Sequence, residues 1–213
     1  MEWQLVTRAA ECRRGKARRS RGSLALLCLA AAFLAPATAR AQNLTYSEVK
    51  LGVLGHDVGF LKGKEGGVDL NPEIIWQSPV SDAWAATVPD YLRWAVQPRP
   101  TIGGEINTSG FTDQAYVGAT WTWQLAGNVL QPGDGIVLSY FFGPSFNDGE
   151  VKATAPNRKS LGSFVLFREA LELGYQITPV YEISALLDHV SNGGLAKQNQ
   201  SINDFGARFG IRF

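Results

Sequence analysis

The chain ends on the run FGARFGIRF (Phe205–Phe213), in which apolar residues stand at the odd positions and Gly or Arg at the even ones. Because successive side chains of a strand point to opposite faces, this period of two predicts a strand with one apolar and one polar face. Residues 115–125 and 179–191 alternate in the same way. The repetition of the pattern predicts an all-β fold.

Alternating segments number about eight, and stretches rich in Gly, Pro, Asn and Asp separate them. One segment loses its phase, because Phe164 and Leu166 do not alternate in step with Leu171, Leu173 and Tyr175. A β-bulge near 167–170 is therefore expected. The expected strands are roughly 46–56, 67–77, 91–107, 114–125, 136–146, 160–177, 179–191 and 202–213.

Alternation alone allows a soluble periplasmic sandwich as well as a membrane barrel. Three features favour an eight-stranded antiparallel transmembrane β-barrel of the bacterial outer membrane. Charges stand in the middle of the polar faces, aromatic residues gather near strand ends, and the last strand is aromatic to its end. A barrel of eight strands is filled by its own side chains, so a general diffusion channel is not expected. The mid-strand charges are Lys50, Glu73, Glu105, Glu172, Arg208 and Arg212. The aromatic residues are Trp76, Trp94, Trp121, Trp123, Tyr175 and Tyr181.

Residues 1–41 are typical of a secretory signal peptide. A positive segment with seven Lys or Arg precedes the apolar stretch 24–34, which is too short to span a bilayer as a helix. Small residues at 39 and 41 predict cleavage before Gln42, which would leave residues 42–213 as the barrel domain. The alternative is an N-terminal membrane anchor that stays attached.

The charge distribution and the cysteines exclude several functions. The net charge of the chain is +1, but residues 42–213 alone carry −5, which speaks against nucleic-acid binding by broad phosphate neutralisation. The only cysteines, Cys12 and Cys28, lie in the signal segment. The exported domain therefore has no disulfide scaffold, no Cys-ligated metal site and no thiol nucleophile.

The two histidines lead to different expectations. His56 begins a polar run after a strand and is expected to be an exposed loop residue. His189 and Ser191 are two residues apart, so they share the face assigned to lipid. If residues 192–202 close a hairpin, Asn203 comes to lie opposite His189 on that outer face. With both termini in the periplasm, this hairpin would lie at the cell surface.

Several motifs in this part of the chain resemble the lipid A 3-O-deacylase family (the PagL type, also labelled acyloxyacyl hydrolase-like). They are Leu187-Asp188-His189-Val190-Ser191-Asn192, Gln198-Asn199-Gln200-Ser201-Ile202-Asn203 and the strand Phe205–Phe213, with looser matches in 53–59, 99–108 and 166–174. The resemblance implies an outer-membrane barrel that hydrolyses the ester of the 3-position acyl chain of lipid A. It also implies a membrane-embedded enzyme whose partner is lipid A or lipopolysaccharide and which needs no cofactor.

Carried over by position, the resemblance assigns a role to each polar residue of the hairpin. Ser191 would be the nucleophile and His189 its general base. Asn199 would help bind the oxyanion, and Asn192 would help position the nucleophile. The family has Glu or Asp where this chain has Asn203, which puts the third member of the catalytic set in doubt.

Several alternatives remain open at this stage. Asp188 and Asp204 have the wrong parity to replace the missing acid unless a bulge turns one of them outward. The chain could be a pseudo-enzyme, a non-catalytic barrel of the adhesin or membrane-stabilising type, or an esterase for another acyl lipid. No catalytic metal is expected, because the two histidines are far apart and the exported domain has no cysteine. Calcium bound by loop carboxylates and a homodimer are both left open.

Overall fold

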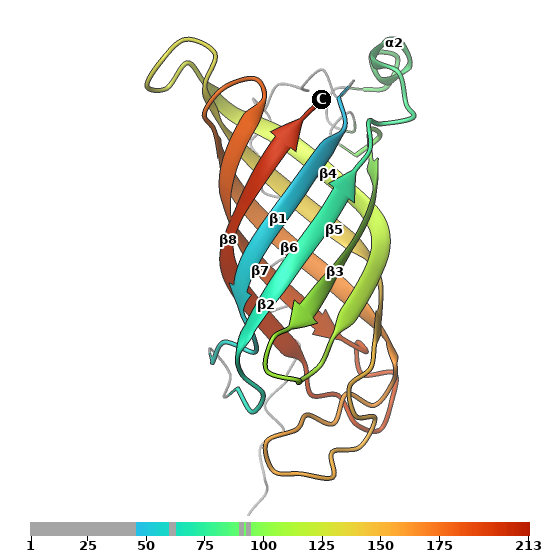
Figure 1. The fold of residues 1–213 in the computed structure, drawn as a ribbon. Helices are drawn as coiled ribbons and strands as arrows, with labels where there is room; N and C mark the ends of the chain where they lie inside the picture. Colours follow the sequence, from blue (N-terminus) through green and yellow to red (C-terminus); the bar gives the residue numbers. More distant parts are fainter. Residues whose placement is uncertain (1–45, 60–62, 90–91, 93–94) are drawn as a thin grey trace, which may run out of the picture.

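The computed structural model describes residues 46–59, 63–89, 92 and 95–213, and the expected signal peptide lies outside them. Eight antiparallel strands close into a barrel in which each strand pairs with its neighbours in the sequence and β8 pairs with β1 (Figure 1). The eight-stranded barrel expected from the sequence is therefore confirmed. The strands are β1 (Glu48–Gly55), β2 (Val68–Ile75), β3 (Arg99–Asn107), β4 (Gln114–Gly127), β5 (Gly135–Asn147), β6 (Val165–Gln176), β7 (Tyr181–Ser191) and β8 (Ile202–Arg212).

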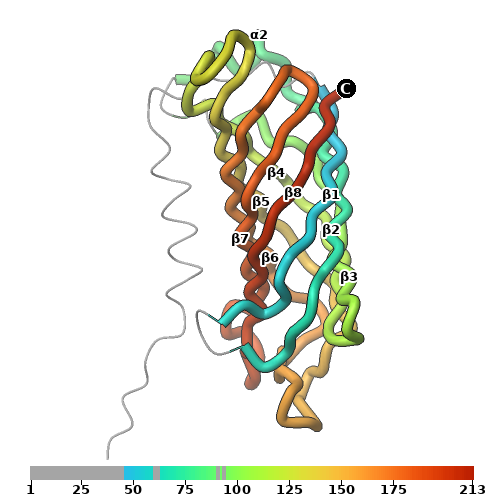
Figure 2. The backbone as a smooth tube through the Cα atoms, turned by 60° about the vertical axis from the view of Figure 1, so that its left-hand side comes forward, coloured from blue at the N-terminus to red at the C-terminus, as the bar shows by residue number. Residues whose placement is uncertain are grey.

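The connections divide the barrel into two ends (Figures 1 and 2). The terminal end carries the C-terminus, the turns 128–134 and 177–180, and the β2–β3 connection with the four-residue helix α2 (Asp82–Ala85). The opposite end, called the loop end below, carries the connections 56–67, 108–113, 148–164 and 192–201. Within the described residues, no helix has the length and apolar character needed to cross a membrane.

The two faces of the strands differ as the alternation predicts. Apolar residues such as Leu51, Phe205 and Phe209 lie exposed on the outer wall, while the charged residues between them are buried in the lumen. Buried charges cost free energy unless they are paired, and here Lys50 Nζ lies 2.9 Å from carboxylate oxygens of both Glu172 and Glu182. The lumen is filled, since a cavity found at its centre measures about 10 Å³, no more than one water requires.

Three local expectations were wrong. β3 begins at Arg99 rather than near residue 91, and β6 begins at Val165 rather than near 160. β6 also contains no bulge, because its register with both neighbours runs without a shift, whereas a shift occurs in β4 between Gln124 and Ala126. Leu166 is out of phase because it points into an apolar layer of the lumen at the loop end. That layer consists of Leu161, Leu166, Val190 and Ile202.

Candidate active site

A hydrogen-bonded row of polar side chains lies on the outer wall, where β7 and β8 approach the loop end. His189 and Asn203 are direct cross-strand partners, and His189 Nδ1 lies 2.7 Å from Asn203 Oδ1. On its other side the ring reaches Ser191, with Nε2 3.2 Å from the Oγ atom. The strand pairing places Asn203 on the same face as Phe205, which is exposed on the outer wall. The sequence analysis expected this placement of the three side chains.

The row fixes the tautomer of His189. The amide oxygen of Asn203 can only accept, so the ring proton is on Nδ1 and points to Asn203. Nε2 then carries a lone pair toward the Ser191 hydroxyl, which can donate its proton to that nitrogen. His189, Ser191 and Asn203 are all buried by neighbouring protein atoms, so little conformational freedom remains in the row. Chemically, a serine with an aligned base is an activated nucleophile.

The turn after Ser191 is held by the side chain of Asn192. Its Nδ2 donates to the carbonyl oxygens of Leu161 at 2.7 Å and Gln198 at 2.5 Å, while its Oδ1 accepts from the backbone of Gly194. These contacts use the polar atoms of the Asn192 side chain. They suit it to positioning the nucleophile, the role that the resemblance suggests.

Asn199 approaches Ser191 from the far side of the same loop. Its Oδ1 accepts from the backbone N–H of Asn192 at 3.1 Å, which orients the amide. That bond does not use the Nδ2 group of Asn199. The loop can pack this tightly because Gly162 is in a left-handed conformation (φ +80°), and a Cβ atom there would lie 1.9 Å from Gln198 O.

The neighbouring carboxylates do not join the row. Asp188 and Asp204 are cross-strand partners of each other but face the lumen. Asp188 Oδ2 accepts from Arg168 Nε at 3.0 Å, and Asp204 Oδ1 accepts from the backbone of Asp57 at 2.7 Å. The register of β7 with β8 shows no shift around these residues. Neither carboxylate therefore turns outward to replace the missing acid at Asn203.

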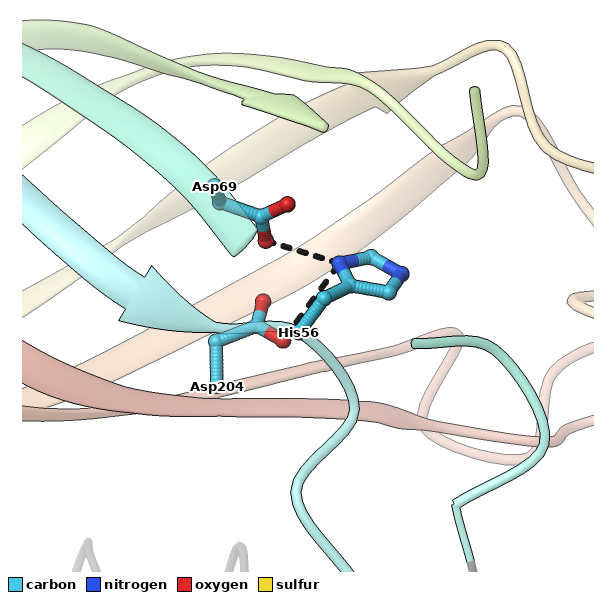
Figure 3. A group of neighbouring side chains, drawn as sticks. All are labelled: His56, Asp69 and Asp204. Atoms are coloured by element: carbon cyan, nitrogen blue, oxygen red, sulfur yellow. Dashed lines mark hydrogen bonds and ion pairs between the residues drawn. The ribbon is translucent and has the colours of Figure 1, made fainter. Parts of the chain in front are cut away.

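His56 contradicts the expectation of an exposed loop residue, because only 4% of its surface is exposed. Its Nδ1 lies 2.7 Å from Asp69 on β2 and 3.6 Å from Asp204 on β8, as Figure 3 shows. Its Nε2 lies 3.3 Å from Glu65 in the loop that folds over the barrel mouth. Its partners come from sequence-distant segments, so the local polar run gave no sign of the burial.

The surroundings of His56 favour its charged form. Burial alone would lower the pKa of His56, but the hydrogen bonds to Asp69 and Glu65 outweigh it and raise the pKa to about 10. Burial likewise opposes ionisation of Glu65, yet the hydrogen bond with His56 and others lower the pKa of this carboxyl to about 2. The two groups form an ion pair that closes the mouth of the lumen beside the outer-wall row.

Two groups in the described part of the barrel bring possible metal ligands together. Oxygen or nitrogen atoms of His56, Asp69 and Asp204 lie within 4.8 Å of one another, and so do those of Glu105, Asp188 and Asp204. In each group a basic side chain already pairs with the carboxylates. His56 contacts Asp69, and Arg168 contacts both Glu105 and Asp188. The chemistry of both groups is that of buried ion pairs.

No role was predicted from the sequence for one further outer-wall residue, Glu169. It pairs across the strands with His189 on one side and Phe142 on the other, so it faces outward like Phe167. The bulge expected near 167–170 left the face of this residue unassigned. The unbroken alternation of β6 between Phe167 and Leu173 was the signal that could have placed it.

Comparison with known proteins adds the family. Residues 107–212 match the family model described as lipid A 3-O-deacylase (PagL), and this range includes all the polar residues described above on β7, on β8 and in their loop. The chain belongs to the PagL family. The resemblance inferred from the sequence is thereby confirmed, and with it the placement in the bacterial outer membrane.

Solved structures agree in fold with the PagL assignment. The crystal structure of the outer membrane enzyme PagL superposes with a TM-score of 0.55 at 14% identity, covering 77% of this chain and 98% of that one. A designed transmembrane β-barrel (TM-score 0.45, 10% identity, 82% and 100% covered) and the N-terminal barrel domain of Pseudomonas aeruginosa OprF (0.43, 12%, 79% and 99%) also match. No curated protein matches the chain in sequence.

Proposed function

We propose that this protein is a serine esterase that removes the ester-linked 3-position acyl chain of lipid A in the outer leaflet. The observation that supports this best is the hydrogen-bonded row from Asn203 through His189 to Ser191 on the lipid-facing wall. Membership of the PagL family supports lipid A as the substrate. We place the loop end at the cell surface, which brings Ser191 level with the outer leaflet.

The first half of the reaction forms an acyl-enzyme. Ser191 Oγ attacks the ester carbonyl carbon while its proton passes to His189 Nε2, which lies in hydrogen-bond range. The tetrahedral intermediate collapses by breaking the bond to the sugar oxygen, and His189 returns the proton to that leaving oxygen. In the second half, water attacks the acyl-enzyme with the same base, and the free fatty acid leaves.

The developing oxyanion needs a donor, and Asn199 is the nearest candidate. Asn199 Oδ1 accepts from the backbone N–H of Asn192, the residue after Ser191, and this bond leaves the Nδ2 group of Asn199 as the donor we assign to the oxyanion. In serine proteases, a donor of this kind stabilises the transition state by about 2.7–4 kcal/mol. The hydrogen bonds of the Asn192 side chain hold the turn between Ser191 and Asn199, which keeps the nucleophile and the donor in fixed relative positions.

The position of the row also fits a substrate that stays in the membrane. The lumen is filled by side chains, so an acyl chain cannot reach Ser191 through the barrel interior. A lipid that diffuses along the outer wall approaches from the face on which Ser191 lies, where 9% of the serine surface is exposed. This location favours a lipid ester over a soluble ester as substrate.

The test is to express the protein in the outer membrane of a Gram-negative host and to measure the mass of its lipid A. The wild type is expected to remove one hydroxyacyl chain, and Ser191→Ala to lower this activity by at least about 10³-fold. Ser184→Ala is the matched control. Ser184 lies on the same strand but faces the lumen, where it donates to Glu172.

Two other results would point elsewhere. Unchanged lipid A around a fully inserted wild-type barrel would contradict the proposal and favour a non-catalytic barrel. Ser191-dependent release of fatty acids from phospholipids, with lipid A intact, would keep the esterase mechanism and replace the substrate.

A further inference from the structure

The outer wall of the barrel carries one carboxylate within its strands. Of the Asp, Glu, Lys, Arg and His residues in the eight described strands, all but Glu169 and His189 point into the lumen. Lipid-facing positions disfavour charge, so an outward glutamate needs a local reason. The two exceptions are not scattered, because Glu169 and His189 are direct cross-strand partners.

Glu169 and Asn203 flank His189 on opposite sides. The strand registers place Glu169 on β6, His189 on β7 and Asn203 on β8 in one row around the barrel. Cβ atoms of such direct partners are about 4.5–5.5 Å apart, so a glutamate side chain spans the distance to the ring. Asn203 satisfies Nδ1 of His189 but brings no charge, whereas Glu169 brings charge from the other side.

The carboxylate of Glu169 is not used elsewhere in the described structure. Its Oε2 atom is buried and has no hydrogen-bond partner among the described residues. Its outer-wall neighbours across β5 and along β6 are Phe142, Phe167 and Leu171, which are all uncharged. The nearest charge on its own strand, Arg168, points into the lumen to Asp188 and Glu105. His189 is therefore the one group able to carry a positive charge that faces Glu169 on the outer wall of the described strands.

We propose that Glu169 is a positioning residue of the esterase site, whose negative charge stabilises the His189 imidazolium in place of the acid missing at Asn203. This inference rests on the proposed function. During acylation the proton of Ser191 Oγ moves to His189 Nε2, and the ring becomes a cation in a poorly solvated place. A carboxylate beside the ring lowers the free energy of that cation without taking the proton itself.

A purely structural role for Glu169 makes a different prediction. A glutamine has nearly the same shape and would pack against Phe142 and Phe167 equally well. Removal of the charge alone therefore separates the two roles.

The experiment measures deacylation of lipid A vesicles by the full-length protein and by Glu169→Gln. The variant is expected to lower kcat about 10- to 100-fold with little change in KM. Glu150→Gln is the control, since it removes a charge at the loop end from a carboxylate that bonds only to Thr154 of its own loop in the described hydrogen bonds.

Rescue variants complete the test. Glu169→Asp should keep part of the activity, and Asn203→Glu placed in the Glu169→Gln background should restore kcat. Unchanged kinetics in Glu169→Gln would overturn the inference while leaving the esterase intact. A slower variant that neither Glu169→Asp nor Asn203→Glu rescues would also overturn it, in favour of a structural role.

Failure of the underlying function can be recognised separately. Wild-type protein that neither deacylates lipid A nor reacts at Ser191 with a fluorophosphonate probe would contradict the proposed function, and this inference with it. A reactive Ser191 whose labelling rate does not depend on Glu169 would contradict the inference alone.

Discussion

Adjacent residues of the β7–β8 hairpin form two polar pairs that serve opposite faces of the barrel. Asp188 and Asp204 pair across the strands inside, and His189 and Asn203 pair one position further on the outside. The inner pair lies among buried cations, whereas the outer pair is joined by a hydrogen bond between a ring and an amide. The alternation of the strands thus keeps the Asp188–Asp204 pair in the lumen and the His189–Asn203 pair on the outer wall. Each face can be altered with a different expected result.

The largest expected effect comes from the inner face. Arg168→Met leaves Asp188 and Glu105 as buried carboxylates without their cation, and it removes the guanidinium stacked 3.7 Å from the ring centre of Tyr116. Loss of one partner from a buried ion pair typically costs about 3–5 kcal/mol of unfolding free energy. Urea-induced unfolding in lipid vesicles measures the change. Lys152 is exposed, so Lys152→Met should change the unfolding free energy by less than about 0.5 kcal/mol. An equal loss in both variants would show that the buried ion pairs of Arg168 contribute no more than an exposed lysine.

The contribution of the His56–Glu65 pair to the unfolding free energy should decrease both at high and at low pH. The raised pKa of His56 means that its stabilising contribution is complete below about pH 6.5 and is lost as the pH rises through 10. The lowered pKa of Glu65 means that its contribution is present above about pH 4.5 and is lost as the pH falls through 2. His56→Gln should therefore lower the unfolding free energy by about 2 kcal/mol near pH 6.

The same unfolding measurements at pH 6 and above pH 10 test this prediction. The difference between wild type and His56→Gln should shrink at the higher pH, because the wild type has then lost its charged pair. A difference that stays constant over this range would show that the ion pair does not act as described.

The smallest expected effect is a gain at the outer face. Asn203→Asp would place a charge on the Nδ1 side of His189, where the amide oxygen now accepts at 2.7 Å. Because Glu169 is proposed to supply charge already, the increase in kcat should be limited to about tenfold. Deacylation kinetics in vesicles measure it, with Asn203→Ala as a control that should be slower than wild type. Loss of activity in a correctly folded Asn203→Asp barrel would refute the placement of Asn203 at the acid position.

Strand alternation was sufficient to predict most of the barrel wall. It placed Phe205 and Phe209 outside, Arg208 inside, and His189 with Ser191 on the outer face, because the period of two is a local property of the backbone. The cross-strand position of Asn203 followed from hairpin closure. These are the features that need no knowledge of distant segments.

The errors came from residues whose surroundings are not local. His56 is buried by partners from β2, β8 and a loop, so its own polar sequence suggested exposure. Leu166 points inward because the lumen becomes apolar near the loop end, and Glu169 points outward beside His189. The assumption that apolar residues face lipid turned the inward Leu166 into evidence for a bulge that β6 does not contain.

The filled lumen has a consequence for how such a catalyst would meet its substrate. With no passage through the barrel and the reactive row on its side, encounters depend on two-dimensional diffusion within one leaflet. Turnover would then follow the surface density of the lipid rather than its bulk concentration. Dilution into excess detergent should slow the reaction even when every molecule of enzyme stays folded.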